Sequence, residues 1–163
     1  MQKHLYFVCP TDHLETIIEA TFKEENYYYS SLGNSVSFEK DIISEINDVI
    51  ETNNIKEVTF ILSNTNKLIL DAIQHENQPL VNGMKRFYYD VIRQKRRNKV
   101  FLKNTHIPII SYLLDKKVTE LKPKINKWLI EGITINAKVY HREKGIFNEV
   151  NQDLFNIKYF SIN

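Results

Sequence analysis

Several residue types that would narrow the fold class are scarce in this chain of 163 residues. A single cysteine, Cys9, excludes an internal disulfide framework. Four glycines and four prolines are few for an all-β chain with many tight turns or for long disordered linkers. No apolar run approaches the roughly 20 residues of a membrane-spanning helix. Because residues 1–8 do not form the succession of basic, apolar and small residues of a leader, the chain is expected to be a cytoplasmic protein.

Net charge is also small, since 22 lysines and arginines face 20 acidic residues to give +2. Such a chain has no overall field that would steer it to nucleic acid or to a membrane. Its basic residues nevertheless gather beside Tyr88 and Tyr89. They are Lys85, Arg86, Arg93, Lys95, Arg96, Arg97 and Lys99. This run is either a phosphate-binding face or the solvated side of a helix, and because the second is the simpler interpretation, nucleic acid is not the expected partner.

Hydrophobic patterning in the first half predicts alternating strands and helices. The length fits one domain over 1–163, with about two-thirds of the unfolded surface buried. Asp12 and Glu15 have capping-box spacing, and Ser37 is suited to begin the next helix. Strands are expected over 3–9, 27–32 and 57–62, with helices over 12–23, over 37–52 and from 68 onward. This order predicts an α/β fold with a mainly parallel sheet and flanking helices.

The second half is richer in helical spacing. Helices are expected over 81–97, 107–114 and 118–130. The alternation over 133–140 predicts a half-buried strand, and a turn at 143–145 leads into 146–150. A last extended segment is expected over 154–162.

Two turns at strand ends offer polar groups to a ligand. In an open α/β sheet, ligands gather outside the carboxyl ends of the strands. Helix-start amides and one ammonium favour a small anion, although the same residues also suit a simple helix cap. The anion-binding candidates are Asn64, Thr65, Asn66 and Lys67 after the third strand, with Gly33 and Asn34 after the second.

A second set of candidates lies after the first strand. Cys9, Asp12 and His13 are close in sequence, and a thiolate beside a histidine base is a nucleophilic arrangement. A half-buried thiol next to a helix cap explains the same residues without catalysis. The two interpretations remain open at the level of sequence.

In order and spacing, these elements resemble the β-class carbonic anhydrases over roughly residues 5–147. The family's first strand ends in Cys-x-Asp-x-Arg, where this chain has Cys9-Pro10-Thr11-Asp12-His13. Its second strand leads to Arg-Asn-Ala-Gly-Asn, matched here by Ser30-Ser31-Leu32-Gly33-Asn34. Its third leads to Gly-His-x-x-Cys-Gly, matched by Ser63-Asn64-Thr65-Asn66-Lys67-Leu68. Late in the family stands His-Gly-Trp-x-Tyr-Asp before a Thr-Gly turn, matched by Asn136-Ala137-Lys138-Val139-Tyr140-His141 before Lys144-Gly145.

The resemblance also implies where zinc ligands should stand. Of the family's Cys, His and Cys ligands only Cys9 is retained, because the other two positions fall on Asn64 and Lys67. Asp12 matches the family's Asp only with one residue inserted, and its Arg falls on His13 or Leu14. Zinc lowers the pKa of bound water from 15.7 to about 7, and one ligand of three does not hold the ion for that task. No cofactor is therefore expected.

Taken together, the sequence favours a non-catalytic carbonic-anhydrase-like domain that binds a small anion or a protein partner. The alternative is an enzyme, either a divergent metal-dependent lyase of the carbonate dehydratase kind or one that uses Cys9, Asp12 and His13. The resemblance further implies a homodimer. No membrane association is expected.

Overall fold

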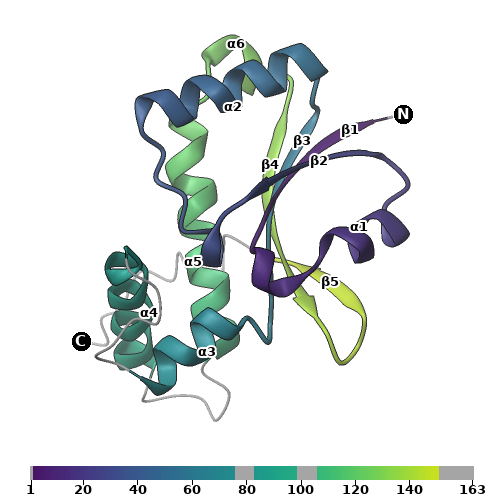
Figure 1. The fold of residues 1–163 in the computed structure, drawn as a ribbon. Helices are drawn as coiled ribbons and strands as arrows, with labels where there is room; N and C mark the ends of the chain where they lie inside the picture. Colours follow the sequence, from purple (N-terminus) through teal and green to yellow (C-terminus); the bar gives the residue numbers. More distant parts are fainter. Residues whose placement is uncertain (1, 76–82, 99–105, 151–163) are drawn as a thin grey trace, which may run out of the picture.

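A computed structural model of the chain describes residues 2–75, 83–98 and 106–150 (Figure 1). Its centre is one five-stranded sheet in the order β2-β1-β3-β4-β5. The first four strands are parallel, and β5 pairs antiparallel with β4. The strands are β1 (Lys3–Val8), β2 (Glu25–Ser30), β3 (Glu57–Ser63), β4 (Thr134–His141) and β5 (Ile146–Glu149). The predicted α/β class with a mainly parallel sheet is confirmed.

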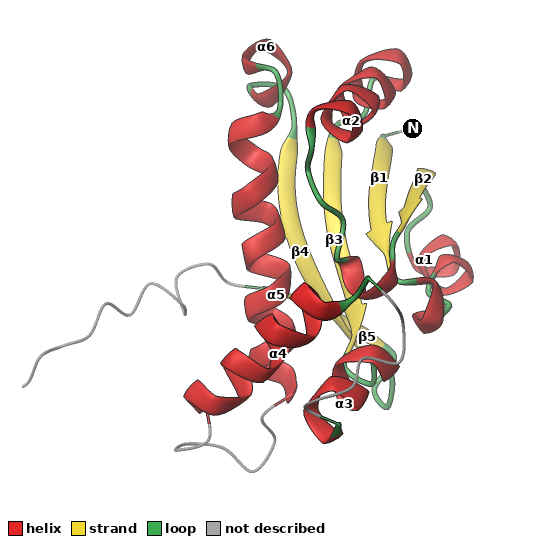
Figure 2. Cartoon of the chain, turned by 60° about the vertical axis from the view of Figure 1, so that its left-hand side comes forward, coloured by secondary structure: helices red, strands yellow, loops and turns green. Residues whose placement is uncertain are grey.

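Helices lie against both faces of this sheet (Figure 2). They are α1 (Glu15–Thr21), α2 (Lys40–Asn53), α3 (Lys67–Gln74), α4 (Lys85–Asn98), α5 (His106–Leu121) and α6 (Lys127–Ile130), with short 3-10 turns η1 (Pro10–Asp12), η2 (Leu32–Asn34) and η3 (Lys122–Lys124). None of the helices in the described part of the chain combines the length and the apolar character needed to cross a bilayer.

Strand periodicity divides the core into two layers. Alternate residues of a strand point to opposite faces, so Leu5 and Phe7 face one side while Tyr6 and Val8 face the other. Leu5 and Phe7 belong to the larger core, which α2, α3, α4 and α5 complete. Tyr6 and Val8 belong to a smaller core closed by Leu14 and Ile18 around α1. One face of the sheet is therefore covered far more extensively than the other.

Three local predictions are wrong. Asp12 does not cap α1, which begins at Glu15 after Leu14 with no side-chain cap, because the Asp12 carboxylate is used elsewhere. Ser37 does not begin α2, whose N-cap is Glu39. The two helices predicted over 107–114 and 118–130 are instead the single helix α5, followed by η3 and α6. The segment expected over 154–162 lies outside the described residues.

Candidate functional site

Three parallel strands bring polar residues together at their carboxyl ends. Cys9 follows β1, Ser63 is the last residue of β3, and Arg142 follows β4. With Asp12 and Asn66 they form what we call the strand-end cluster. This is the edge at which ligands bind in open α/β sheets.

Asp12 is the centre of the strand-end cluster. Its side chain is buried, with 2% of the residue exposed. Oδ2 accepts from the backbone N–H of Ser63 (2.8 Å), and Oδ1 accepts from Nδ2 of Asn66 (2.9 Å). Nη2 of Arg142 donates to the backbone carbonyl of Asp12 (2.6 Å). Burial raises the pKa of Asp12 above its usual value, while the donors from Ser63 and Asn66 and the charge of Arg142 oppose that rise.

The loop after β3 uses most of its amides internally. Besides binding Asp12, Asn66 caps α3, because its Oδ1 accepts from the N–H of Ile69 (3.1 Å). Asn64 donates to Glu143 (2.7 Å) and accepts from the N–H of Arg142 (3.1 Å). Of the four anion-binding candidates in this loop, Thr65 and Lys67 are exposed, whereas Asn64 and Asn66 are buried and engaged.

Cys9 lies beneath the turn after β2. Its Sγ accepts from the N–H of Gly33 (3.1 Å) and lies 3.1 Å from Oγ1 of Thr11. Gly33 has a φ of +61°, and a Cβ at this position would stand 2.6 Å from Cζ of Phe87. His13 is exposed, and no hydrogen bond between described residues joins it to Cys9. The nucleophilic role predicted for Cys9, Asp12 and His13 stays a prediction.

A cavity of about 350 Å³ opens beside Gly33 and Asn34. It lies between residues 33–38, α4 and α5, and we call it the α4–α5 cavity. Its charged lining residues are Arg86, Asp90, Lys116, Lys117, Glu120 and Lys124. Four cationic side chains against two acidic ones leave this cavity net positive.

Asn34 lines the cavity and is buried. Its Nδ2 donates to the carbonyls of Phe7 (3.1 Å) and Ile61 (2.8 Å), which fixes the orientation of the amide. Its Oδ1 is buried and accepts no hydrogen bond within the described part of the chain. Tyr6, Asn26 and Ser31 each have a buried oxygen in the same situation, and the Asn34 oxygen has almost no accessible surface, so it does not by itself mark a ligand site.

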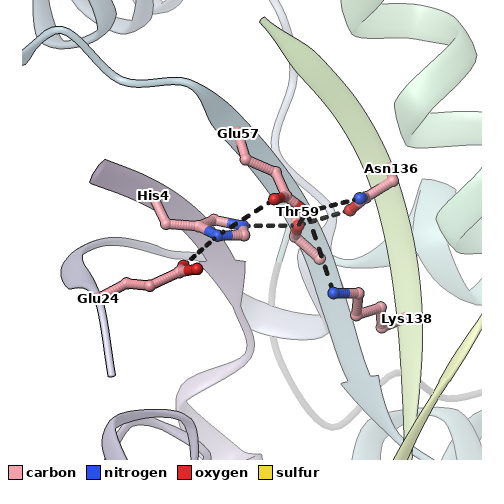
Figure 3. A network of polar contacts seen from close by, with 6 residues as sticks. All are labelled: His4, Glu24, Glu57, Thr59, Asn136 and Lys138. Carbon is pink, nitrogen blue, oxygen red and sulfur yellow. Dashed lines mark hydrogen bonds and ion pairs between the residues drawn. The ribbon is translucent and has the colours of Figure 1, made fainter. Parts of the chain in front are cut away.

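Sequence reasoning missed a second polar cluster, which lies on the sheet face that α1 covers in part. Figure 3 shows this sheet network, which consists of His4, Glu24, Glu57, Thr59, Asn136 and Lys138. Thr59 lies opposite Asn136 in the parallel register, and His4 lies opposite Glu57. The only sequence signal was a polar residue at alternate positions of three strands, and without the register that signal does not predict contact.

His4 holds the sheet network together. The residue is 2% exposed; its Nδ1 lies 3.0 Å from Oε2 of Glu24, and its Nε2 lies 2.7 Å from Oγ1 of Thr59. Asn136 accepts from the Thr59 hydroxyl (2.5 Å) and donates to Glu57 (2.7 Å). Burial lowers the pKa of His4 below its usual value, while the two glutamates oppose that change. Thr59 is fully buried, so this carboxylate, imidazole and hydroxyl do not reach a substrate.

Comparisons with known proteins bear on the fold. No protein-family model matches the chain, and a search of curated proteins finds no relative. Among solved structures, the chain is similar to a mutant of the β-carbonic anhydrase CafD of Aspergillus fumigatus, with TM-score 0.72, 16% identity, and coverage of 93% of this chain and 90% of that one. It is also similar to a tetrameric β-carbonic anhydrase of Sordaria macrospora, with TM-score 0.72, 12% identity, and coverage of 92% of this chain and 81% of that one. A third similar structure is the Coccomyxa β-carbonic anhydrase in complex with acetazolamide, with TM-score 0.70, 14% identity, and coverage of 91% and 72%.

These neighbours correct one expectation. The sequence led us to expect no cofactor, and that expectation is wrong as stated, because the structural neighbours belong to a class of zinc enzymes. Within the described ranges, no group of three or more His, Cys, Asp or Glu residues is placed to hold a metal ion. The resemblance inferred from sequence is nevertheless confirmed for the architecture, and the chain has the fold of the β-carbonic anhydrases.

Proposed function

We propose that this chain is a non-catalytic domain of carbonic-anhydrase-like fold that binds a small oxyanion in the α4–α5 cavity. One observation carries the proposal: four cationic side chains line the cavity against two acidic ones, so the cavity is net positive. Gly33 and Asn34, two of the residues predicted from sequence to bind an anion, both line it.

Hydrogen-bonding capacity in the cavity exceeds what the protein itself uses. Lys117 donates to the carbonyl of Val36 (2.9 Å) and to Glu120 (2.8 Å). Lys116 is paired with Asp90 (2.6 Å). Each ammonium has three donors, so both lysines retain capacity for a ligand oxygen. Within the described part of the chain, no hydrogen bond or ion pair is found for Arg86.

A protonated oxyanion satisfies both kinds of group. Its charged oxygens accept from the lysines, and its hydroxyl donates to an acidic side chain of the lining, Asp90 or Glu120. Hydrogencarbonate and hydrogenphosphate have this combination. A cavity of about 350 Å³ falls at the lower end of the sizes typical of small-molecule sites, so either ion fits with water.

The strand-end cluster supports a non-catalytic role. In this fold the edge would hold the reacting groups, but here Ser63 and Asn66 are occupied by the protein's own Asp12. An external anion at that edge would compete with a covalently tethered carboxylate. This supports ligand binding in the α4–α5 cavity, although Thr65 and Lys67 of the loop are exposed.

Isothermal titration with hydrogencarbonate and with phosphate tests this proposal. We expect saturable binding by the wild-type chain, weakened about tenfold or more in Lys116→Gln, since a charged hydrogen bond contributes about 1.5–3 kcal/mol. The matched control is Lys127→Gln on α6, which removes the same charge away from the cavity and should bind as the wild type does. Equal binding by both variants would contradict the site.

A hydration assay tests the non-catalytic part separately. We expect no acceleration of CO₂ hydration above buffer, with or without added zinc. Acceleration that disappears in Cys9→Ser would overturn this part of the proposal and favour the divergent lyase. The homodimer and the cytoplasmic location implied by the sequence stay predictions, and light scattering decides the first.

A further inference from the structure

One face of α4 concentrates positive charge. The exposed residues of this helix are Lys85, Arg86, Tyr89, Arg93, Arg96 and Arg97, which we call the α4 face. At about 100° per residue these six positions fall within a sector roughly 120° wide and extend about 18 Å along the axis. Phe87 and Val91 lie on the opposite side and are buried. Five of the seven cations of the basic run that the sequence left open therefore form one stripe on the surface. Lys95 is half-buried and donates to the carbonyl of Ile73, and Lys99 lies outside the described residues.

The α4 face carries positive charges and no acidic residue. The only acidic residue of α4, Asp90, is turned to Lys116 of α5 (2.6 Å). The α4 face thus holds five of the chain's 22 lysines and arginines and none of its 20 acidic residues, so the rest of the chain is net acidic. A helix face that serves only solubility typically carries both signs with opposite charges at i,i+4 spacing.

Helix stability does not explain the arrangement. Lys85 and Arg86 lie in the first turn, where the helix dipole disfavours cations. Arg93 and Arg97 stand at i,i+4 spacing, where like charges repel by a few tenths of a kcal/mol. Arg96 and Arg97 suit the last turn, so the dipole accounts for only part of the stripe. The remaining cations are better explained by a partner.

Tyr89 indicates which polyanion this partner is. It is one of the two large hydrophobic residues found strongly exposed in the described chain, with 64% of its surface accessible, and it lies between Lys85 and Arg93 on the stripe. An aromatic ring flanked by cations suits a base stacked beside two phosphates, because every unpaired base has a π-face. A duplex hides its bases from such a ring, and an anionic membrane would be expected to meet more apolar residues.

From this combination we propose that the α4 face binds single-stranded nucleic acid without sequence preference. Lys85 and the arginines neutralise the phosphates, and Tyr89 stacks on a base. This goes beyond the proposed function, since it uses a different class of ligand and a surface that shares only Arg86 with the α4–α5 cavity.

Fluorescence anisotropy with a labelled single-stranded oligothymidylate of about 15 nucleotides tests the proposal on the full chain. We expect binding that weakens with salt. The variant Arg93→Gln with Arg97→Gln should lower the slope of log K against log salt by about 1.4, because each cation accounts for about 0.7. Lys40→Gln with Lys56→Gln removes the same charge from exposed positions elsewhere and should leave the slope unchanged.

Tyr89→Ala separates stacking from charge. We expect affinity to fall about tenfold with an unchanged salt slope. The proposal is overturned if the arginine variant and the lysine control behave alike, if a duplex of the same length binds as tightly as the single strand, or if Tyr89→Ala binds as the wild type does. Anionic phosphatidylserine vesicles that bind when the oligonucleotide does not would indicate a membrane partner instead. Circular dichroism of each variant checks that α4 is retained.

Discussion

At the carboxyl end of the sheet, the buried carboxylate of Asp12 is held by a backbone amide and a side-chain amide. On the face of the sheet toward the amino ends of the strands, Glu24 and Glu57 are held instead around the imidazole of His4. The donors to Asp12 do not change protonation in the ordinary pH range, whereas the partner of the two glutamates does. We therefore expect the strand-end cluster to be sensitive to geometry and the sheet network to be sensitive to pH.

The largest effect is expected from Gly33→Ala. Gly33 combines a φ of +61° with a ring carbon of Phe87 only 2.6 Å from where a Cβ would stand. The left-handed backbone costs about 1–2 kcal/mol for alanine and the clash a further 1–3, so chemical denaturation should show a loss of about 3–4 kcal/mol. Gly145→Ala is a matched control, because Gly145 has a φ of +64° with open space around it. Equal losses in the two variants would show that Phe87 does not constrain this turn.

Asp12→Ala should follow, with a loss of about 3 kcal/mol in the free energy of unfolding. The substitution leaves the N–H of Ser63 and Nδ2 of Asn66 buried without an acceptor, and each such group costs about 1–3 kcal/mol. Asp48→Ala removes an exposed carboxylate from α2 and should change stability by less than about 0.5 kcal/mol. If the two variants unfold at the same denaturant concentration, the hydrogen bonds of Asp12 do not stabilise the fold.

The smallest effect is expected from His4 of the sheet network, as a dependence of the free energy of unfolding on pH. Burial lowers the pKa of His4 in the folded protein below 6.5, so the unfolded chain takes up a proton first as the pH falls. Its contribution is present above pH 6.5 and is lost as the pH falls through the lowered folded pKa, by up to about 1.4 kcal/mol per pH unit. His4→Asn should flatten this dependence, and His75→Asn, at an exposed position, should preserve it. An NMR titration that gives His4 a pKa at or above 6.5 would contradict the prediction directly.

Local patterns were enough to predict the strands of the sheet. The apolar runs at 3–9 and 57–62 correspond to β1 and β3 within a residue or two, because a strand buried on both faces is continuous in sequence. Helix α5 was split in prediction because Asp115, Lys116 and Lys117 interrupt its apolar spacing. In the structure Lys116 reaches Asp90, and Lys117 reaches the carbonyl of Val36. In the sequence, charged residues that interrupt an apolar pattern indicate the end of a helix. In the structure these lysines are inside α5 and point into the cavity beside it.

The candidate sites were less predictable, because they depend on contacts between distant residues. Asp12 has the local spacing of a helix cap, yet it binds groups 51 and 54 residues away. The sheet network joins His4 to Thr59 and Thr59 to Asn136, which are 55 and 77 residues apart. Only the strand register brings these side chains together, and a single sequence does not give the register.

The position of Cys9 has a consequence for measuring motion in this protein. It is the only cysteine of the chain, its thiol is buried, and it accepts from the N–H of Gly33, the residue wedged against Phe87 of α4. A reagent in solution reaches this sulfur only when the turn at Gly33 or the adjoining helix moves away. Where reclosing is faster than alkylation, the labelling rate reports the equilibrium constant of that opening. The rate of Cys9 alkylation thus measures how often this region opens. It can be compared with and without a ligand, and no engineered cysteine is needed.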